Sequence, residues 1–178
     1  MVFPIAGGNE SKGYEVENSL RFNDGDSAKL ALAFGSGGNT KIWTVSCWFK
    51  RGILSSRQSF LNVGSSGSEY MSLYIDSDDK LYWVTESGGN TYRIGSSAKF
   101  RDPSAWYHVV VTVDVSNSTS ADRLRLYVNG VRLSTVSYTA PTAGILTKAL
   151  EHRIGLSNGT SHPLGAYLAD VYLSLIHI

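Results

Sequence analysis

Two short segments carry tyrosine and arginine at alternating positions, a combination suited to binding sugars. Tyr70 and Tyr74 lie in EYMSLYID, and Arg123, Arg125 and Tyr127 lie in RLRLYVNG. Tyrosine rings stack on the apolar faces of sugars, and arginine donates fixed hydrogen bonds to hydroxyl or carboxylate groups. If both segments contribute to one sheet face, these side chains form a single ligand-binding patch.

Two other interpretations of such a face stay open. The face packs on another subunit, because tyrosine and arginine are enriched in protein interfaces. Alternatively, these side chains simply cover the apolar body of the sheet. The sequence alone does not separate the three.

Carboxylate pairs suited to glycoside hydrolysis are missing from the predicted strands. That reaction needs two carboxyl groups about 5 to 9 Å apart on one face. Glu15 and Glu17 are close in sequence, but they precede the first predicted strand. The sequence also has no G-x-S-x-G elbow, phosphate-binding loop or histidine-rich zinc pattern. It therefore predicts no catalytic residues and a protein that is not an enzyme.

An acidic cluster, Asp76, Asp78 and Asp79, stands between two predicted strands. Ca²⁺ requires clustered carboxylate oxygens of this kind. Tight turns select the same residues, because aspartate tolerates the left-handed conformation and bonds its own backbone. We expect a turn here and assign no metal ligand.

Cys47 and His108 are the other residues with reactive side chains in predicted strands. Cys47 lies in an apolar set without a neighbouring histidine or second cysteine, so we expect a small buried hydrophobe rather than a reactive thiol. His108 lacks a partner base or nucleophile in the sequence, and we expect it to be structural.

The elements that position these residues are β-strands. Residues 106–130 read as one long hairpin, whose first arm is apolar on nearly both faces like a central strand and whose second arm alternates. Asn129 and Gly130 supply a turn with φ > 0 into a further strand over residues 131–136. A second strong strand over residues 41–50 places Trp43, Val45, Cys47 and Phe49 on one face.

Short apolar runs between turn signals continue along the chain, and residues 92–95 form one of the shorter strands. About eleven to thirteen strands are expected, with no convincing helical period between Tyr14 and Tyr172. This pattern predicts an all-β protein, a two-sheet antiparallel jelly-roll β-sandwich. Strands near both ends suggest that the ends meet at a sheet edge or side by side.

Composition limits the function classes. With 16 basic and 15 acidic residues among 178, the net charge is +1, so we expect no nucleic-acid partner. The apolar stretches are too short and too interrupted to span a bilayer, so no membrane insertion is expected. The N-terminus lacks the features of a signal peptide, which indicates synthesis in a cytosol without classical export.

Several phrases of the chain resemble the laminin-G type of the concanavalin A-like lectin/glucanase superfamily. They are SLRFNDGDSAKL, TVSCWFKRG, FRDPSAWYHVVVTVD and RLRLYVNGV, followed by HRIG and GAYLADVYL. The variety most similar to it occurs in structural proteins of marine bacteriophages. The resemblance runs from about Tyr14 to Tyr172 and implies a jelly-roll sandwich with a glycan-binding or virion-surface role.

The same resemblance bears on catalysis and on metals. Some members of this superfamily are glycoside hydrolases with an E-x-D-x-x-E strand, and this chain lacks that pattern. The laminin-G type often binds Ca²⁺ at its rim, but its ligands match no particular residues of this chain. Ca²⁺ is therefore implied only by the resemblance, and no cofactor is assigned.

The chain is divided into three parts on this basis. Residues 1–13, with Pro4 and the pair Gly7-Gly8, are expected to form a flexible arm, and residues 14–172 the sandwich. Residues 173–178, LSLIHI, break the pattern and resemble the translated end of a transposase adaptor used in sequencing libraries. We expect them to be an adaptor-derived tail on a truncated reading frame.

The predicted function is therefore a non-enzymatic recognition module that binds carbohydrate or a host cell surface. The expected location is a phage virion, in its tail or capsid, with other virion subunits as partners. One alternative is a purely structural or oligomerisation domain of a virion protein. The other is a glycoside hydrolase-like domain that acts on polysaccharide.

Overall fold

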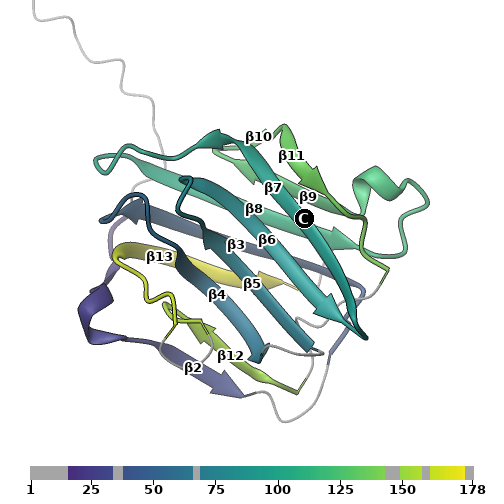
Figure 1. The fold of residues 1–178 in the computed structure, drawn as a ribbon, viewed down its shortest axis with the longest axis horizontal. Helices are drawn as coiled ribbons and strands as arrows, with labels where there is room; N and C mark the ends of the chain where they lie inside the picture. The colour runs from purple at the N-terminus through teal and green to yellow at the C-terminus, as the bar shows by residue number, and fades with distance from the viewer. Residues whose placement is uncertain (1–15, 34–37, 66–68, 143–148, 158–160, 175–178) are drawn as a thin grey trace, which may run out of the picture.

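The fold is a β-sandwich of two antiparallel sheets that lie face to face (Figure 1). The structure, a computed structural model, describes residues 16–33, 38–65, 69–142, 149–157 and 161–174. Within them it contains thirteen strands and two short 3₁₀ helices, η1 (Asp24–Asp26) and η2 (Ser120–Asp122). The all-β sandwich expected from the sequence is confirmed.

The six-stranded sheet contains the predicted central hairpin. Its strands in spatial order are β1 (Leu20–Phe22), β13 (Ala166–Ser174), β3 (Ile42–Arg51), β8 (Trp106–Asp114), β9 (Leu124–Val128) and β10 (Val131–Arg132). β8 and β9 pair as the two arms of that hairpin, and β8 lies inside the sheet.

The seven-stranded sheet is built from the middle of the chain. Its strands in spatial order are β11 (Thr135–Tyr138), β7 (Asn90–Lys99), β6 (Lys80–Ser87), β5 (Glu69–Ile75), β4 (Gln58–Ser65), β12 (Glu151–Ile154) and β2 (Leu30–Ala33). β7 is longer than the short strand expected at residues 92–95. The polar residues of β7 weaken its alternating hydrophobic pattern, but they do not prevent its backbone from pairing with β6.

The chain changes sheets shortly after the Asn129–Gly130 turn. Both turn residues have positive φ, 50° and 77°, as the sequence predicts. The prediction of a single further strand over residues 131–136 is wrong, however, because β10 ends at Arg132 and β11 pairs with β7 of the other sheet. The hydrophobic pattern of a sequence shows which residues form strands, but it does not show which sheet each strand joins.

The core fills the space between the sheets with alternating inward side chains. The predicted inward face of β3, Trp43, Val45, Cys47 and Phe49, is buried in it. The Trp43 ring contacts Trp83 of β6 at a centroid distance of 4.7 Å. Burial raises the pKa of the Cys47 thiol to about 12, so this cysteine is a buried hydrophobe, as expected.

The strands near the two ends of the chain lie side by side. β1 pairs antiparallel with β13, and Leu20 is opposite Leu168. β13 continues through Leu173 and Ser174, which pair with β3, whereas residues 175–178 and the arm predicted at 1–13 lie outside the described residues. None of the helices in the described part of the chain is both long and apolar enough to cross a bilayer.

Candidate functional site

The five predicted ligand-binding residues lie on two different sheets. Tyr70 and Tyr74 belong to β5 of the seven-stranded sheet, whereas Arg125 and Tyr127 belong to β9 of the six-stranded sheet, just after Arg123. Their outward sides face away from each other across the sandwich. The prediction that all five residues form a single patch is therefore wrong. The alternation of residues within a strand does not say which sheet the strand joins.

The outer face of the seven-stranded sheet carries a tyrosine cluster of its own. Tyr74 stacks on Tyr82 of β6 with ring centroids 5.5 Å apart and planes inclined by 21°. Val84 completes this second apolar cluster, and Tyr70 packs against its side. Tyr74 and Tyr82 are each only 6% exposed, so they form the floor of the face, while Tyr70 is more accessible.

Two arginines cover the rings of this floor. The guanidinium of Arg57 lies 4.8 Å from the Tyr74 ring centroid, and that of Arg93 lies 4.4 Å from the Tyr82 centroid. Both distances are within the range of cation–π attraction. Neither arginine was among the predicted site residues. Arg57 stands before β4, in a segment without alternation, and Arg93 lies on a strand predicted only in part.

Gly95 allows the Tyr82 ring to lie flat on the sheet. The two residues are direct partners between β6 and β7. A Cβ atom on Gly95 would lie 2.6 Å from Cδ1 of Tyr82, closer than two carbon atoms can pack. The absence of a side chain at this position therefore makes room for the ring and, above it, for the guanidinium of Arg93. We call Tyr70, Tyr74, Tyr82, Arg57 and Arg93 the tyrosine–arginine face.

Acidic residues at the end of β5 hold part of this face in place. Arg57 Nε donates to Asp76 Oδ1 at 3.1 Å and forms an ion pair with the same carboxylate. Burial alone would raise the pKa of Asp76, but hydrogen bonds from Arg57 and from the backbone of Ser77 lower it below its ordinary value. The Tyr82 hydroxyl donates to Asp78 Oδ2 at 2.9 Å. Asp78 also pairs with Lys80.

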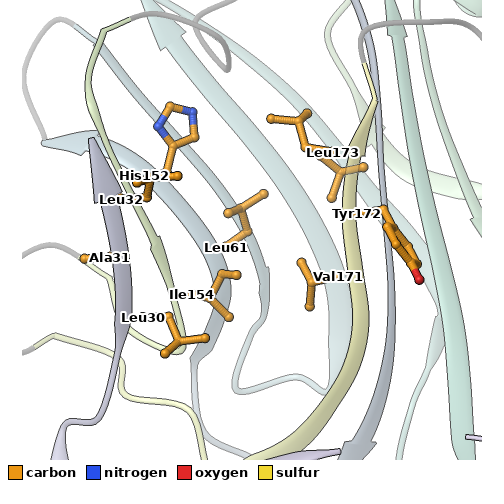
Figure 2. Close-up of a pocket in the computed structure, with 10 residues that line it drawn as sticks. Leu30, Ala31, Leu32, Leu61, His152, Ile154, Val171, Tyr172 and Leu173 are labelled. Carbon is orange, nitrogen blue, oxygen red and sulfur yellow. The ribbon is translucent and has the colours of Figure 1, made fainter. Parts of the chain in front are cut away.

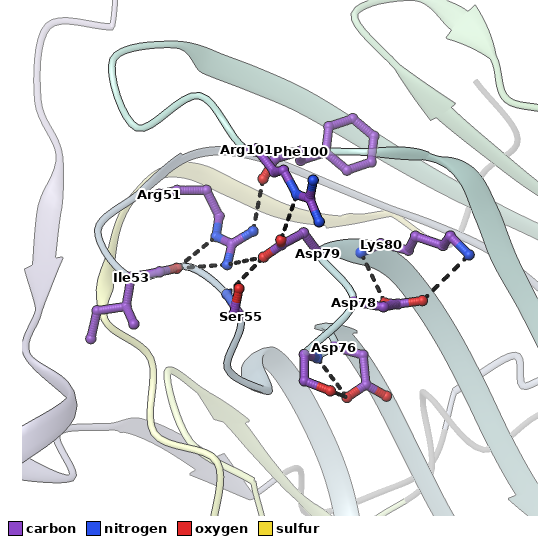
Figure 3. A network of polar contacts seen from close by, with 10 residues as sticks. Arg51, Ile53, Ser55, Asp76, Asp78, Asp79, Lys80, Phe100 and Arg101 are labelled. Carbon is purple, nitrogen blue, oxygen red and sulfur yellow. Dashed lines mark hydrogen bonds and ion pairs between the residues drawn. The ribbon is translucent and has the colours of Figure 1, made fainter.

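The Asp76–Asp79 segment is a turn, as expected. The N–H of Asp79 donates to the carbonyl of Asp76 at 2.9 Å, and Asp79 has a φ of 62°. The three carboxylates point to separate partners, and that of Asp79 turns into the protein, where it meets Arg51 and Arg101 (Figure 3). The backbone N–H of Ser55 also donates to it, at 2.8 Å.

The outer face of the six-stranded sheet has a different character. Arg123 donates through Nε to the carbonyl of Asn117 at 2.8 Å, and Arg125 lies 3.4 Å from Asp122. Both predicted arginines are thus engaged by the segment that connects β8 to β9. Elsewhere on this face Trp48 stacks on His108, with ring centroids 4.9 Å apart.

His108 has a structural environment on this face. Its ring is half-buried against Trp48. Burial lowers its pKa, although the charge of Asp170 acts in the opposite direction. The histidine is therefore mainly neutral at physiological pH and contributes aromatic packing.

An apolar pocket of about 200 Å³ opens between the sheets beside the edge strand β2 (Figure 2). Leu30 and Leu32 of β2 face it from one sheet, and Val171 and Leu173 of β13 face it from the other. Leu30 and Leu32 are 53% and 59% exposed. Its apolar walls offer few hydrogen-bonding groups, so the pocket is unsuited to a sugar.

A family model of laminin G type, described as the concanavalin A-like lectin/glucanases superfamily, matches residues 23–174. No curated protein matches the chain in a sequence search.

Solved structures with the same fold include domains LG4-5 of the mouse laminin α1 chain, at a TM-score of 0.69 and 14% identity. That match covers 92% of this chain and 43% of the laminin fragment, so the chain spans less than half of the fragment's length. The CBM40 module of the Ruminococcus gnavus IT-sialidase, bound to α2,3 sialyllactose, gives a TM-score of 0.58 at 16% identity over 82% of this chain and 91% of the module. The heptameric SAP-like pentraxin of Limulus polyphemus gives 0.59 at 16% identity, over 90% and 77%.

Proposed function

Because the chain belongs to the concanavalin A-like lectin/glucanases superfamily, we propose that it is a carbohydrate-binding module whose tyrosine–arginine face binds a glycan. The observation that carries this proposal is the stacked pair Tyr74 and Tyr82, covered by Arg57 and Arg93. This covered pair supports the more accessible Tyr70 ring beside the guanidinium groups, and that combination matches a sugar, which has both an apolar face and polar edges. The fold is also that of a sialyllactose-bound CBM40 module.

The seven-stranded sheet is preferred over the opposite outer face for a physical reason. On the six-stranded sheet, both predicted arginines are turned toward the β8–β9 connection. On the seven-stranded sheet, Arg57 is also paired with Asp76, but both guanidinium groups stay over the aromatic floor, beside Tyr70.

Isothermal titration calorimetry against a panel of oligosaccharides tests this proposal. Tyr70→Ala removes the most accessible ring of the face, and we expect about a tenfold loss of affinity. Tyr127→Ala on the opposite outer face is the matched control and should leave affinity unchanged. A loss with Tyr127→Ala alone would move binding to the six-stranded sheet, and no binding to any oligosaccharide would contradict the proposed function.

The protein is proposed to bind glycans without cleaving them. A glycoside hydrolase needs a carboxylic acid whose raised pKa keeps it protonated. Asp76 and Asp78, at the edge of this face, have lowered pKa values and are therefore ionised at neutral pH. Glu86, on the face itself, lies opposite Tyr70 and Thr91, so its direct cross-strand partners include no second carboxylate. Glu17 is exposed, and Glu15 lies outside the described residues. Release of reducing sugar from algal or bacterial polysaccharides would contradict this part of the proposal.

Metal is not required for binding in this proposal. Arg57 engages Asp76, while Lys80 and Tyr82 engage Asp78, so these two carboxylates of the turn already have partners. We expect EDTA to leave the affinity unchanged. A loss that added Ca²⁺ reverses would show that a metal ion takes part.

A second candidate function is subunit association through the six-stranded sheet. The observation in its favour is the aromatic character of that face, with Trp48 on His108 and with Tyr172 61% exposed. Aromatic side chains are enriched in protein interfaces. Light scattering after size-exclusion chromatography tests it, because a dimer that Tyr172→Ser dissociates would support association.

The proposed location is the surface of a phage virion, in the tail or the capsid. Its support is the resemblance of the flanking phrases to bacteriophage structural proteins. Mass spectrometry of purified virions that encode this chain tests the location. Its absence from the particles would contradict it.

A further inference from the structure

Arg93 lies on the tyrosine–arginine face with its Nε buried and without a hydrogen-bond partner among the described residues. We propose that the glycan bound there carries a carboxylate or sulfate group and that Arg93 binds this group; the inference rests on the proposed function. It deepens that function by naming the chemical class of the ligand.

Most arginines of the described ranges have an oxygen partner, whereas Arg93 and Arg21 contact tyrosine rings instead. A carboxylate or carbonyl oxygen is the partner of each of seven arginines: Arg51, Arg57, Arg101, Arg123, Arg125, Arg132 and Arg153. Within the described ranges, Arg93 Nε and Arg125 Nε are both buried without a hydrogen-bond partner, but Arg125 lies 3.4 Å from the carboxylate of Asp122. A buried donor that lacks an acceptor costs free energy, and an anion that approaches the guanidinium would remove that cost.

The position of the Arg93 guanidinium is fixed before a ligand arrives. It lies 4.4 Å from the Tyr82 ring centroid, and the ring is held against Gly95 of the adjacent strand and by its hydroxyl bond to Asp78. A guanidinium stacked on a ring loses little rotational freedom on binding. It therefore presents its planar set of donors in one orientation, as bidentate binding of an anionic group requires.

Among the described residues, no carboxylate lies within ion-pair distance of Arg93. Asp76 is paired with Arg57, although the charge of Arg93 also lowers its pKa. Asp78 is paired with Lys80, and Glu86 lies opposite Tyr70 on the same face. The charge of Arg93 also reaches Tyr74. Burial raises the pKa of Tyr74, and the charge of Arg93 partly opposes that increase. A ligand with a negative group above Tyr82 and its sugar ring toward Tyr70 would meet both features.

Matched pairs of oligosaccharides test the inference by calorimetry. The pairs are 3′-sialyllactose with lactose, tetragalacturonic acid with its methyl ester, and a sulfated carrageenan tetrasaccharide with its desulfated form. In at least one pair we expect the anionic member to bind about tenfold tighter or more. The pair that shows the difference identifies the anionic group as a carboxylate or a sulfate.

Variants assign the effect to the residue. Arg93→Gln should abolish the preference for the anionic member while affinity for the neutral member changes little. Arg93→Lys, which keeps the charge but loses the bidentate geometry, should retain an intermediate preference. Arg21→Gln is the matched control, because Arg21 also lies over a tyrosine ring, that of Tyr167 on the opposite sheet, and should have no effect. Circular dichroism confirms that each variant is folded.

The outcomes separate the two proposals. Neutral and anionic members that bind equally, with Arg93→Gln weakening both alike or neither, would overturn the inference and leave the glycan-binding function standing. A preference for the anion that survives Arg93→Gln would also overturn it. Binding to none of the oligosaccharides would overturn both the inference and the proposed glycan-binding function.

Discussion

The guanidinium of Arg51 lies 3.3 Å from the carboxylate of Asp79, and neither side chain is more than 1% exposed. Arg51 also donates to the carbonyl of Phe100 at 2.8 Å and, through Nε, to that of Ile53 at 3.0 Å. This ion pair joins β3 of the six-stranded sheet to the turn before β6 of the seven-stranded sheet (Figure 3). It connects the two layers at one end of the sandwich and positions the turn that carries Asp76 and Asp78.

Removal of Asp79 should strongly destabilise the protein. Asp79→Ala leaves the buried charge of Arg51 without its partner, and breaking a buried pair in this way costs about 3–5 kcal/mol. Urea denaturation measures the free energy of unfolding. Asp24→Ala, at an exposed aspartate of η1, is the control and should stay within about 0.5 kcal/mol of the wild type. Similar values for the two variants would show that the pair contributes little.

Stability should depend on pH through the same carboxylate. Burial alone would raise the pKa of Asp79, but hydrogen bonds from Ser55 and Arg101 and the charge of Arg51 hold it below its ordinary value. The folded state therefore binds fewer protons than the unfolded chain. Its stabilising contribution is complete above the unfolded pKa of about 3.9 and is lost as the pH falls through the lower folded value.

Urea denaturation in steps down from neutral pH measures this dependence. Asp79→Asn, which cannot titrate, should show a shallower loss of stability in acid than the wild type. Equal slopes for the two proteins below about pH 4 would show that another group controls acid unfolding.

Cys47 should be unreactive until the protein unfolds. Burial raises its pKa to about 12, so at pH 8 almost no thiolate is present, and the side chain is 3% exposed. We expect no reaction with Ellman's reagent in the folded protein and one equivalent of thiol per chain in guanidinium chloride. Rapid reaction under native conditions would contradict the buried position.

A methyl group at position 95 should disturb the tyrosine–arginine face. In Gly95→Ala the new Cβ overlaps the Tyr82 ring, so the ring and the Arg93 guanidinium above it must move. Overpacking of this kind costs about 1–3 kcal/mol, and oligosaccharide affinity should fall with it. Gly25→Ala is the control, since the nearest heavy atom to its Cβ is 3.8 Å away. Unchanged affinity in a folded Gly95→Ala protein would show that ring position is unimportant.

Much of the fold could be predicted from the sequence because its strands alternate clearly. The inward set of β3, the β8–β9 hairpin and the Asn129–Gly130 turn all depend on local patterns with a period of two or on turn chemistry. The family match over residues 23–174 confirms the resemblance to the laminin-G type of the concanavalin A-like superfamily.

The candidate site was predicted only in part, because it depends on long-range pairing. Tyr70 and Tyr74 were identified as outward-facing residues, but Tyr82 joins them only through the β5–β6 register. Arg57 and Arg93 reach the rings from a loop and from β7. No local pattern specifies which arginine stands over which ring, and none placed β5 and β9 in separate sheets.

The edge strand β2 bears on how glycan binding is measured. Among the described strands it ends the seven-stranded sheet, with Leu30 and Leu32 largely uncovered. A free apolar edge of this kind is a template for pairing with a second chain. Two chains joined there would carry two copies of the glycan site, and on a densely coated array their avidity would imitate tight binding by one site. The variant Leu32→Lys would oppose such pairing, so that the array would report the affinity of a single glycan site.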